Sequence, residues 1–548
     1  MTTAPLPAPT WPHCDDLTSP DGCRGVRTPG RAKCLAHLTP PERIAYLGTI
    51  QPGDDVDARG TRFTPELLHE LLDRLYTYGT APRFGTADFF EASFIGDATF
   101  HRAVFDRYAD FRRAAFAEPA DFTDAEFHRE ADFDRAVFAG HAWFGGAVFD
   151  RQAGFARAAF AADAAFNEVT FGGNVSFKGV RFAASRWLGP LTVNGTLDLE
   201  DTVFAVPATL DFWAWRAQLG RARFEGPATV RAYAAVIDLT EVETAGPLTV
   251  ASSQDHGTPR PPGFNSATAS ITSLHRVDAA LLILRDIDFS QCRFSEVHHL
   301  DQLGLDGECT FAVPPAGLRR GRYGPIRWSR RQVLAEEHHW RAADRHQGLA
   351  AGWEPGPSAT PGSTPGPAAL AVQYRKLRKA FEDGKDEPGA ADFYYGEMEM
   401  RRHDRRRTTW GVRGLLHAYW LLSGYGLRAT RAFAWLLVAM ALTWGTLVLL
   451  GLPNSDPQPQ ATGIQAAPGR PVLLTIDTPD PVLTGPLSGR LSGPRAEKAV
   501  HVVLNSVIFR SSDQTLTTTG TYTEMTSRLL EPVLLGLGLL AIRSRVKR

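Results

Sequence analysis

The stretch ADFRRAAFAEPADFTDAEFHREADF, residues 109–133, repeats phenylalanine at steps that alternate between five and six residues. The same series runs from Phe89 to Phe166 with alanine two positions before each member, and valine takes the alanine position at 169, 175 and 180. Residues two apart lie on one side of an extended segment, so each Ala-x-Phe triplet directs a small and a large apolar side chain inward. A 3.6-residue helix does not keep this alternation in step, whereas a solenoid of short faces does. The pattern predicts a β-solenoid.

The size of one coil follows from how many side chains its interior must hold. A coil of only two repeat steps would enclose two phenylalanines and two alanines, which makes a cramped interior. We therefore expect a coil with four faces, made of two five-residue steps and two six-residue steps. This period stacks Asp88, Asp110 and Asp132 in one outer column and makes two arginine columns. The columns fit a solvated surface, and the alternative is a docking seam for an anion or a protein. The arginine columns are Arg107, Arg129 and Arg151, and Arg113, Arg135 and Arg157.

These repeats resemble the pentapeptide-repeat family, whose members carry a small residue two positions before a central Leu or Phe. The resemblance covers Phe84 to Phe182, and it implies a mainly β protein built as a right-handed, four-sided β-helix. The chain inserts one residue in every second repeat, as a Phe-rich branch of that family also does. The pattern weakens after Phe182 but keeps similar steps, so we expect the solenoid to occupy residues 81–311.

Some pentapeptide-repeat proteins imitate DNA and inhibit gyrase. From Phe84 to Phe182 this chain carries 15 acidic and 10 basic residues, which is a poor copy of a polyanion. The whole chain has 59 Lys and Arg against 60 Asp and Glu, which argues against a nucleic-acid binder steered by overall charge. We therefore expect no nucleic-acid partner.

Residues 1–80 contain four metal-ligand residue types in the order C-x8-C-x10-C-x2-H: Cys14, Cys23, Cys34 and His37. Three thiolates and one imidazole are a normal tetrahedral zinc set, and such a closed set leaves no position for a reacting water. The segment therefore predicts a structural zinc clip, with His13 as an alternative fourth ligand; the other interpretation is a group of unrelated buried thiols. The rest of this amino-terminal cap is a helix, residues 64–76, which we expect to cover the first coil.

The carboxy-terminal half divides by composition into four parts. Residues 312–350 carry a helix from Ser329 to about Gln347. Its Glu336, Glu337, His338, His339 and His346 fit a solvated face, and the alternative is a metal site. A Pro/Gly linker, 351–368, juxtamembrane helices, 369–430, and a membrane region, 431–548, follow. Gly411 to Gly426 fits an interfacial helix with its aromatic rings at headgroup depth.

Two segments of the membrane region are long and apolar. Residues 433–452 carry no charge over a length that crosses a bilayer, and residues 529–542 cross if their helix begins nearer Thr521. Arginines precede the first span and a basic cluster ends the chain, so the positive-inside rule places the solenoid and both termini in the cytoplasm. Residues 453–494 then form an external loop of an inner or plasma membrane protein.

The sequence predicts a function without catalysis. We find no Walker A sequence, no Rossmann fingerprint and no Ser, His and Asp set that can be placed in space, so we expect no enzyme. The leading hypothesis is a membrane-anchored scaffold whose solenoid binds a protein partner. The alternative is a channel-like homo-oligomer, because an apolar run at 499–509 and Thr517 to Gly520 lie between the spans. This layout resembles two-transmembrane potassium channels but lacks their filter sequence.

Overall fold

The computed structural model describes residues 9–16, 22–76, 81–253, 268–321, 324–327, 330–343, 352–355, 365–453, 458–463, 474–477, 490–508 and 514–546, with 481, 483 and 486. The chain divides into two compact units, Met1–Phe393 and Tyr394–Arg548. Most of the predicted linker at 351–368 and much of the loop at 453–494 lie outside the described residues.

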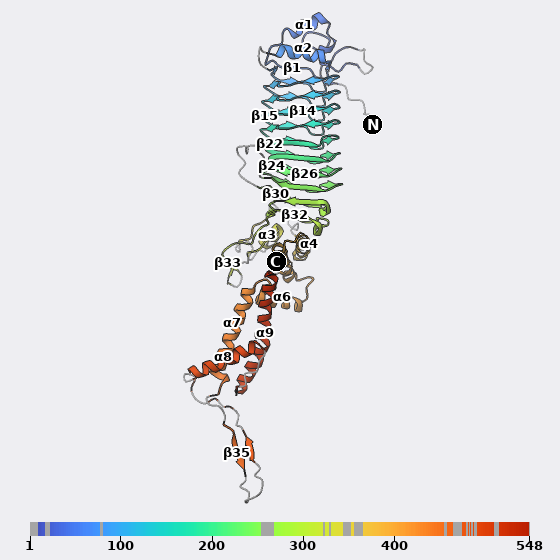
Figure 1. Cartoon of the computed structure of the whole chain (residues 1–548). Coiled ribbons are helices and arrows are strands. Elements are labelled where there is room, and N and C mark those ends of the chain that lie inside the picture. The colour runs from blue at the N-terminus through green and yellow to red at the C-terminus, as the bar shows by residue number, and fades with distance from the viewer. Residues whose placement is uncertain are drawn as a thin grey trace. The chain divides into compact units, whose positions relative to one another are not determined.

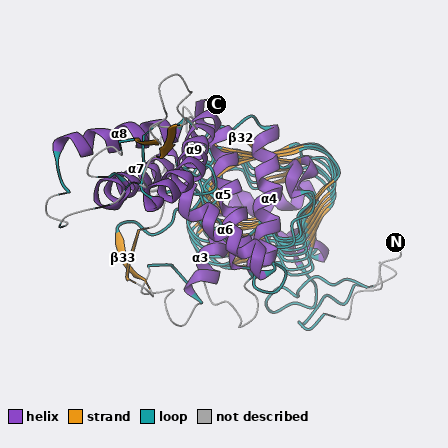
Figure 2. Ribbon diagram, turned by 90° about the horizontal axis from the view of Figure 1, so that it is seen from below, coloured by secondary structure: helices purple, strands orange, loops and turns teal. Residues whose placement is uncertain are grey.

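The first unit is a parallel β-solenoid of about ten turns (Figure 1). Ala87, Ala109, Ala131 and Ala153 pair in succession, so each regular coil takes four repeat steps as expected. Each of these coils has four two-residue strands, and successive coils overlie one another when seen along the stack (Figure 2). The short strands are β1 (Val56–Asp57), β2 (Arg62–Phe63), β3 (Arg83–Phe84), β4 (Ala87–Asp88), β5 (Ser93–Phe94), β6 (Ala98–Thr99), β7 (Val104–Phe105), β8 (Ala109–Asp110), β9 (Ala115–Phe116), β10 (Ala120–Asp121), β11 (Glu126–Phe127), β12 (Ala131–Asp132), β13 (Val137–Phe138), β14 (Ala142–Trp143), β15 (Val148–Phe149), β16 (Ala153–Gly154), β17 (Ala159–Phe160), β18 (Ala164–Ala165), β19 (Thr170–Phe171), β20 (Val175–Ser176) and β21 (Arg181–Phe182).

Stacked phenylalanine rings fill the core. The rings of Phe116 and Phe138, one coil apart, lie parallel with centroids 4.7 Å apart, close to the spacing of hydrogen-bonded strands. Rings on different faces meet edge to face, as Phe122 and Phe133 do at 5.3 Å and 87°. Both arrangements suit the quadrupole of an aromatic ring, so the ladder adds specific ring contacts to the burial of apolar area.

The alternation of five and six residues corresponds to two kinds of corner. In a five-residue step the chain makes a tight turn, closed by a hydrogen bond from the amide of Ala92 to the carbonyl of Phe89. The residue before that alanine, Glu91, has φ of +57°, and Arg113 and Arg135 repeat this left-handed conformation. The six-residue steps make a wider bend, so the inserted residue belongs to the corner and leaves the inward Ala-x-Phe triplets unchanged.

Beyond Phe182 the coils are less regular. The long strand β22 (Trp187–Asp198) continues through a position where the earlier coils have a corner. Each coil is then two residues shorter, because Ala208 pairs with Ala228 and Ala228 pairs with Leu248. The ladder continues to a bridge between Asp288 and Thr310. The remaining strands are β23 (Val203–Phe204), β24 (Ala208–Gln218), β25 (Arg223–Phe224), β26 (Ala228–Ala232), β27 (Val236–Asp238), β28 (Glu243–Thr244), β29 (Leu248–Ser252), β30 (Ser270–Ser273), β31 (Leu282–Arg285), β32 (Gly304–Asp306) and the hairpin β33 (Leu318–Gly321) and β34 (Gly324–Arg327).

Helices lie at both ends of the stack. At the first end, η1 (Leu35–His37) and α1 (Pro40–Leu47) precede β1, and α2 (Pro65–Leu75) follows β2. The Thr64 hydroxyl caps α2 by accepting from the amide of Leu67. After the stack come α3 (Ala335–Ala342), α4 (Pro367–Asp383) and α5 (Glu387–His403). Phe311 in the last coil stacks on Phe289 at 5.1 Å and meets Phe393 of α5 edge to face at 5.0 Å. These contacts extend the aromatic core into the carboxy-terminal cap.

Two predictions about α3 are wrong. The helix begins at Ala335 and not at Ser329, because Val333 forms a β-bridge with Ala312. Glu336 and Glu337 are buried and do not form a solvated face. His338 donates to the Val313 carbonyl, and His346 lies outside the described residues.

The second unit contains α6 (Trp410–Ser423), α7 (Ala429–Thr446) with a π-helical end at Leu447–Gly451, α8 (Gly493–Val507), α9 (Thr518–Val546) and the hairpin β35 (Gln460–Gly463) and β36 (Leu474–Asp477). Two of its helices, Ala429–Gly451 and Thr518–Arg543, are long and apolar enough to cross a membrane. Gly520 and Gly451 pack backbone to backbone, and a Cβ on Gly520 would lie 2.4 Å from the Gly451 carbonyl oxygen. Small residues permit such close approach of membrane helices.

The start of the second apolar helix meets the condition that the sequence set for a span, because the helix begins at Thr518, close to Thr521. Thr518 to Gly520 therefore form its first turn and not a loop between helices. Tyr425 is buried and donates a hydrogen bond to Glu399, so its ring packs inside this unit and not on its surface.

Candidate metal centre

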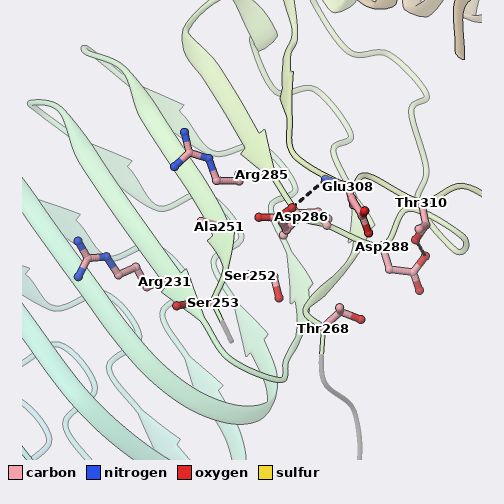
Figure 3. A pocket seen from close by; sticks show the side chains of 11 residues that line it. Arg231, Ala251, Ser252, Ser253, Thr268, Arg285, Asp286, Asp288, Glu308 and Thr310 are labelled. Atoms are coloured by element: carbon pink, nitrogen blue, oxygen red, sulfur yellow. Dashed lines mark hydrogen bonds between the residues drawn. The ribbon is translucent and has the colours of Figure 1, made fainter. Parts of the chain in front are cut away.

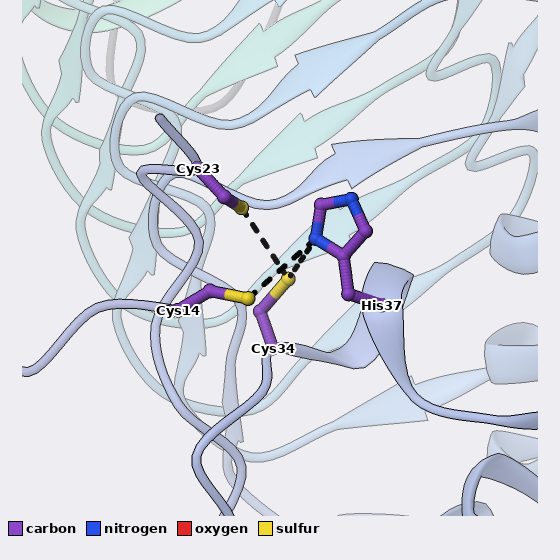
Figure 4. A group of neighbouring side chains, drawn as sticks. All are labelled: Cys14, Cys23, Cys34 and His37. Carbon is purple, nitrogen blue, oxygen red and sulfur yellow. Dashed lines mark hydrogen bonds between the residues drawn. The ribbon is translucent and has the colours of Figure 1, made fainter. Parts of the chain in front are cut away.

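A loop and a single 3-10 turn bring the predicted ligands together. Cys14 and Gly25 are joined by a backbone hydrogen bond of 2.8 Å, which places the first two cysteines on neighbouring segments. Cys34 immediately precedes η1, and the turn of that element directs His37 back over the sulfur of Cys34 (Figure 4). The C-x2-H spacing thus places two of the predicted ligands on one turn.

The distances fit a tetrahedral zinc ion. One ligand atom from each of Cys14, Cys23, Cys34 and His37 lies within 4.8 Å of all the others. The Cys23 and Cys34 sulfurs are 3.6 Å apart, and Nδ1 of His37 is 3.6 Å from the Cys14 sulfur and 3.4 Å from that of Cys34. Ideal zinc bonds of about 2.3 Å to sulfur and about 2.0 Å to nitrogen require edges of about 3.8 Å and about 3.6 Å. His13 is not in the group; its Nδ1 lies 3.3 Å from the Trp11 carbonyl.

The groups around the cluster suit a bound cation. The Asp16 carboxylate lies 3.5 Å from Nε2 of His37, the ring nitrogen that faces away from the sulfurs. Such a carboxylate orients a ligating imidazole and raises its basicity. The Gly25 amide donates to the Cys23 sulfur at 3.3 Å. Hydrogen bonding from Cys34 lowers the pKa of Cys23 to about 5, and the same bond together with burial raises the pKa of Cys34.

The site is closed and is attached to the solenoid. Cys14 and Cys34 are buried, and a Cβ on Gly25 would lie 2.7 Å from the Cys34 Cβ, so glycine permits the close approach. Arg24, next to Cys23, pairs with Glu91 in a tight turn of the solenoid at 2.5 Å. A metal here would hold this loop against the first coils, and the four-ligand set leaves no open position for catalysis.

The acidic outer column has a structural role. The predicted register is correct, because Asp88 pairs with Asp110 and Asp110 with Asp132. Each carboxylate accepts a hydrogen bond from the amide two residues later, as Asp110 does from Arg112 at 2.9 Å. Burial raises the pKa of Asp88 and of Asp132 to about 6, with repulsion from Asp110 adding to the effect. These aspartates therefore stabilise the tight turns that follow their strands.

A cavity of about 630 Å³ lies beside β29 and β31 (Figure 3). Its polar groups are engaged in local structure: Arg285 pairs with Asp306, and Asp286 accepts from the Glu308 amide at 2.7 Å. Asp288 accepts from the Ser290 amide at 2.8 Å. The lining therefore stabilises the later coils.

A buried ion cluster lies in the carboxy-terminal cap. Arg331 makes two hydrogen bonds to Glu337, at 2.6 and 2.7 Å, and Arg341 and the Tyr374 hydroxyl also donate to that carboxylate. Although burial opposes it, the two guanidinium groups lower the pKa of Glu337 to about 2. The neighbouring Glu336 accepts from the Phe294 amide at 2.5 Å, and burial raises its pKa to about 7. Glu336 therefore attaches α3 to the last coils of the solenoid, and Glu337 attaches it to α4.

Comparison with known proteins identifies the repeat. Residues 111–159 match the family described as pentapeptide repeats (9 copies), and they coincide with the coils whose register is most regular. Residues 111–159 are pentapeptide repeats. No curated protein and no solved structure gives a significant match to the chain. The family match therefore covers these repeats alone, and the other coils, the caps and the second unit are interpreted from their own residues.

Proposed function

We propose that the protein is a membrane-anchored scaffold, whose pentapeptide-repeat domain binds a protein partner in the cytoplasm. The observation that carries this proposal is a rigid solenoid in the same chain as two helices of membrane-spanning length, Ala429–Gly451 and Thr518–Arg543. Arg405, Arg406 and Arg407 precede the first of these helices, which supports a cytoplasmic solenoid by the positive-inside rule. The solenoid serves as a binding surface and not as a catalyst.

The face that carries β14 and β18 is the best candidate for partner binding. Trp143 and Trp187 are 41% and 50% exposed, and the small Ala165 pairs beside Trp143 in the ladder. A cavity of about 640 Å³ is lined by Ala165, Trp187 and Pro190. Large aromatic side chains around a small recess are typical of the anchor points of protein interfaces.

Membrane fractionation tests the anchor. The full chain should stay in the membrane pellet after alkaline carbonate extraction, and a chain lacking residues 429–548 should move to the supernatant. A shortened chain that remains in the carbonate-resistant pellet would refute the anchor. For the binding face, photo-crosslinking from position 143 should trap a defined partner that crosslinking from Val137, exposed on another face, does not.

We further propose that Cys14, Cys23, Cys34 and His37 bind one structural zinc ion. The purified full chain should contain one zinc per chain by elemental analysis, and Cys34→Ser should lose it while His13→Ala keeps it. Cobalt substitution should give the charge-transfer bands of a thiolate-bound tetrahedral ion. A folded wild-type chain with no bound metal after purification without chelators would contradict the proposal.

The alternative function, a channel-like oligomer, has its own test. Thr517, which belongs to the segment between the spans in the channel-like alternative, donates to the Leu450 carbonyl at 2.7 Å, which supports a packing role at the end of α7. A channel should give conductance in a planar bilayer that changes in Thr517→Ala. A silent bilayer with correctly inserted protein would count against that alternative.

A further inference from the structure

One carboxyl group lies at the centre of the paired apolar helices. Glu531 is fully buried, and in the sequence it lies almost midway between Thr518 and Arg543, the ends of the second apolar span. At about 1.5 Å per residue each end of the span is roughly 20 Å away, so the side chain is near the middle of the span. Its Oε1 accepts a hydrogen bond of 2.9 Å from the Thr443 hydroxyl of α7.

The two helices are in close contact on both sides of this pair. Toward one end, the ring of Phe433 packs on Gly538, where a Cβ would lie 3.0 Å from the ring. Toward the other end, Gly451 and Gly520 pack backbone to backbone. Glu531 is therefore enclosed between helices that small residues bring together, and it does not face lipid.

The charge of a Glu531 carboxylate would have no counterpart. Its Oε2 is buried and makes no hydrogen bond within the described part of the chain, and no ion pair to Glu531 occurs there. On α7 and α9, Arg431 donates to the Trp420 carbonyl and Arg528 pairs with Glu524 at 2.8 Å. On α6, His417 donates to the Arg413 carbonyl, and the Arg413 side chain is half-buried. On α8, Arg495 donates to the Val448 and Leu452 carbonyls, Glu497 and His501 are exposed, and Lys498 is half-buried.

An ionised carboxylate at the centre of a bilayer is costly unless it is paired or hydrated, whereas a protonated carboxyl group is neutral. The Thr443 hydroxyl satisfies one oxygen only. We propose that Glu531 and Thr443 form a proton-binding site inside the helix pair, in which Glu531 holds a proton at neutral pH. The site rests on the proposed membrane insertion of α7 and α9.

Infrared difference spectroscopy tests this site directly. The full chain and its Glu531→Gln variant are reconstituted in phosphatidylcholine vesicles at pH 7, and only carbonate-resistant vesicles are measured. The wild-type minus variant spectrum should contain one protonated-carboxyl C=O band. Thr443→Val should move that band to higher frequency, because the C=O group loses its hydrogen bond. Glu524→Gln on the same helix is the matched control and should leave the band in place.

Each alternative result is distinct. Carboxylate stretches in place of the C=O band at pH 7 would overturn the proton site. A C=O band that is replaced by carboxylate stretches when sodium chloride replaces choline chloride would assign the site to a metal cation and also overturn it. Protein extracted from the vesicles by carbonate would refute membrane insertion instead, so the two failures are distinguishable.

Discussion

Phe138 and Val137 are consecutive residues of β13 on opposite sides of the solenoid wall. Phe138 is fully buried and Val137 is 47% exposed. The Phe138 ring stacks on Phe116 at 4.7 Å and on Phe160 at 4.8 Å, so it is enclosed between two coils. Replacing Phe138 by alanine removes both stacked contacts and leaves a cavity that the hydrogen-bonded coils above and below cannot close.

Truncation of a buried phenylalanine to alanine costs about 3–5 kcal/mol. Stacked pairs contribute about 0.5–1.5 kcal/mol each beyond area burial, so we place Phe138→Ala at the upper end, about 5 kcal/mol. Val137→Ala removes two exposed methyl groups and should cost less than about 0.5 kcal/mol. The ratio of these two effects is a direct measure of the alternation of inward and outward side chains.

Hydrogen-exchange mass spectrometry of the full chain in detergent measures both effects locally. Because each 1.4 kcal/mol changes an opening equilibrium about tenfold, peptides from residues 111–182 should exchange on the order of a thousandfold faster in Phe138→Ala. The same peptides in Val137→Ala should match the wild type. Equal effects of the two substitutions, or a change below about 1 kcal/mol for Phe138→Ala, would refute the stacked-ring core.

Burial raises the pKa of Glu336 to about 7, above the ordinary 4.5. The stability that protonated Glu336 contributes is therefore fully present below pH 4.5 and is lost as pH rises through 7, a loss of about 3 kcal/mol. Glu336→Gln should abolish this loss, so the Phe294 amide should exchange more slowly in the variant than in the wild type at pH 8. Glu337→Ala should destabilise the carboxy-terminal cap by about 3–5 kcal/mol in the same experiment, because two buried arginines lose their partner, and an effect below about 1 kcal/mol would contradict the ion cluster. Gly520→Val should lower the thermal midpoint of the helical signal in detergent, since overpacking costs about 1–3 kcal/mol, whereas Gly536→Val, where a Cβ meets no atom within 4 Å, should leave it unchanged.

The regular coils could be predicted from the sequence because one side-chain type fills one structural position. Phenylalanine faces inward at every step, so its spacing reports the coil length and the number of faces directly. The aspartate column follows from the same spacing, since residues one period apart become neighbours. The corner geometry could not be predicted: spacing shows where a residue is inserted, but not that Glu91 or Arg113 takes a left-handed conformation.

The candidate metal-ligand set could be predicted from residue types and the C-x2-H spacing. The position of the Asp16 carboxylate near His37 could not be predicted, because an acidic residue in a loop carries no spacing signal. The burial of Glu336 and Glu337 was also missed. A short charged helix fits a solvated surface, and the partners that make burial favourable, Phe294 and Tyr374, lie far away in the sequence on either side. Long-range pairing of this kind appears only in the folded chain.

Site-specific thiol labelling tests the anchored arrangement most directly. A cysteine is placed at Thr462 in the hairpin between the apolar helices, and another at Ala161 on the exposed solenoid surface. The chain is expressed in sealed vesicles of one orientation and treated with a membrane-impermeant maleimide, and each site is read separately by peptide mass spectrometry. The account predicts that the two cysteines are labelled from opposite sides of the membrane. Labelling of both cysteines from the same side would contradict it.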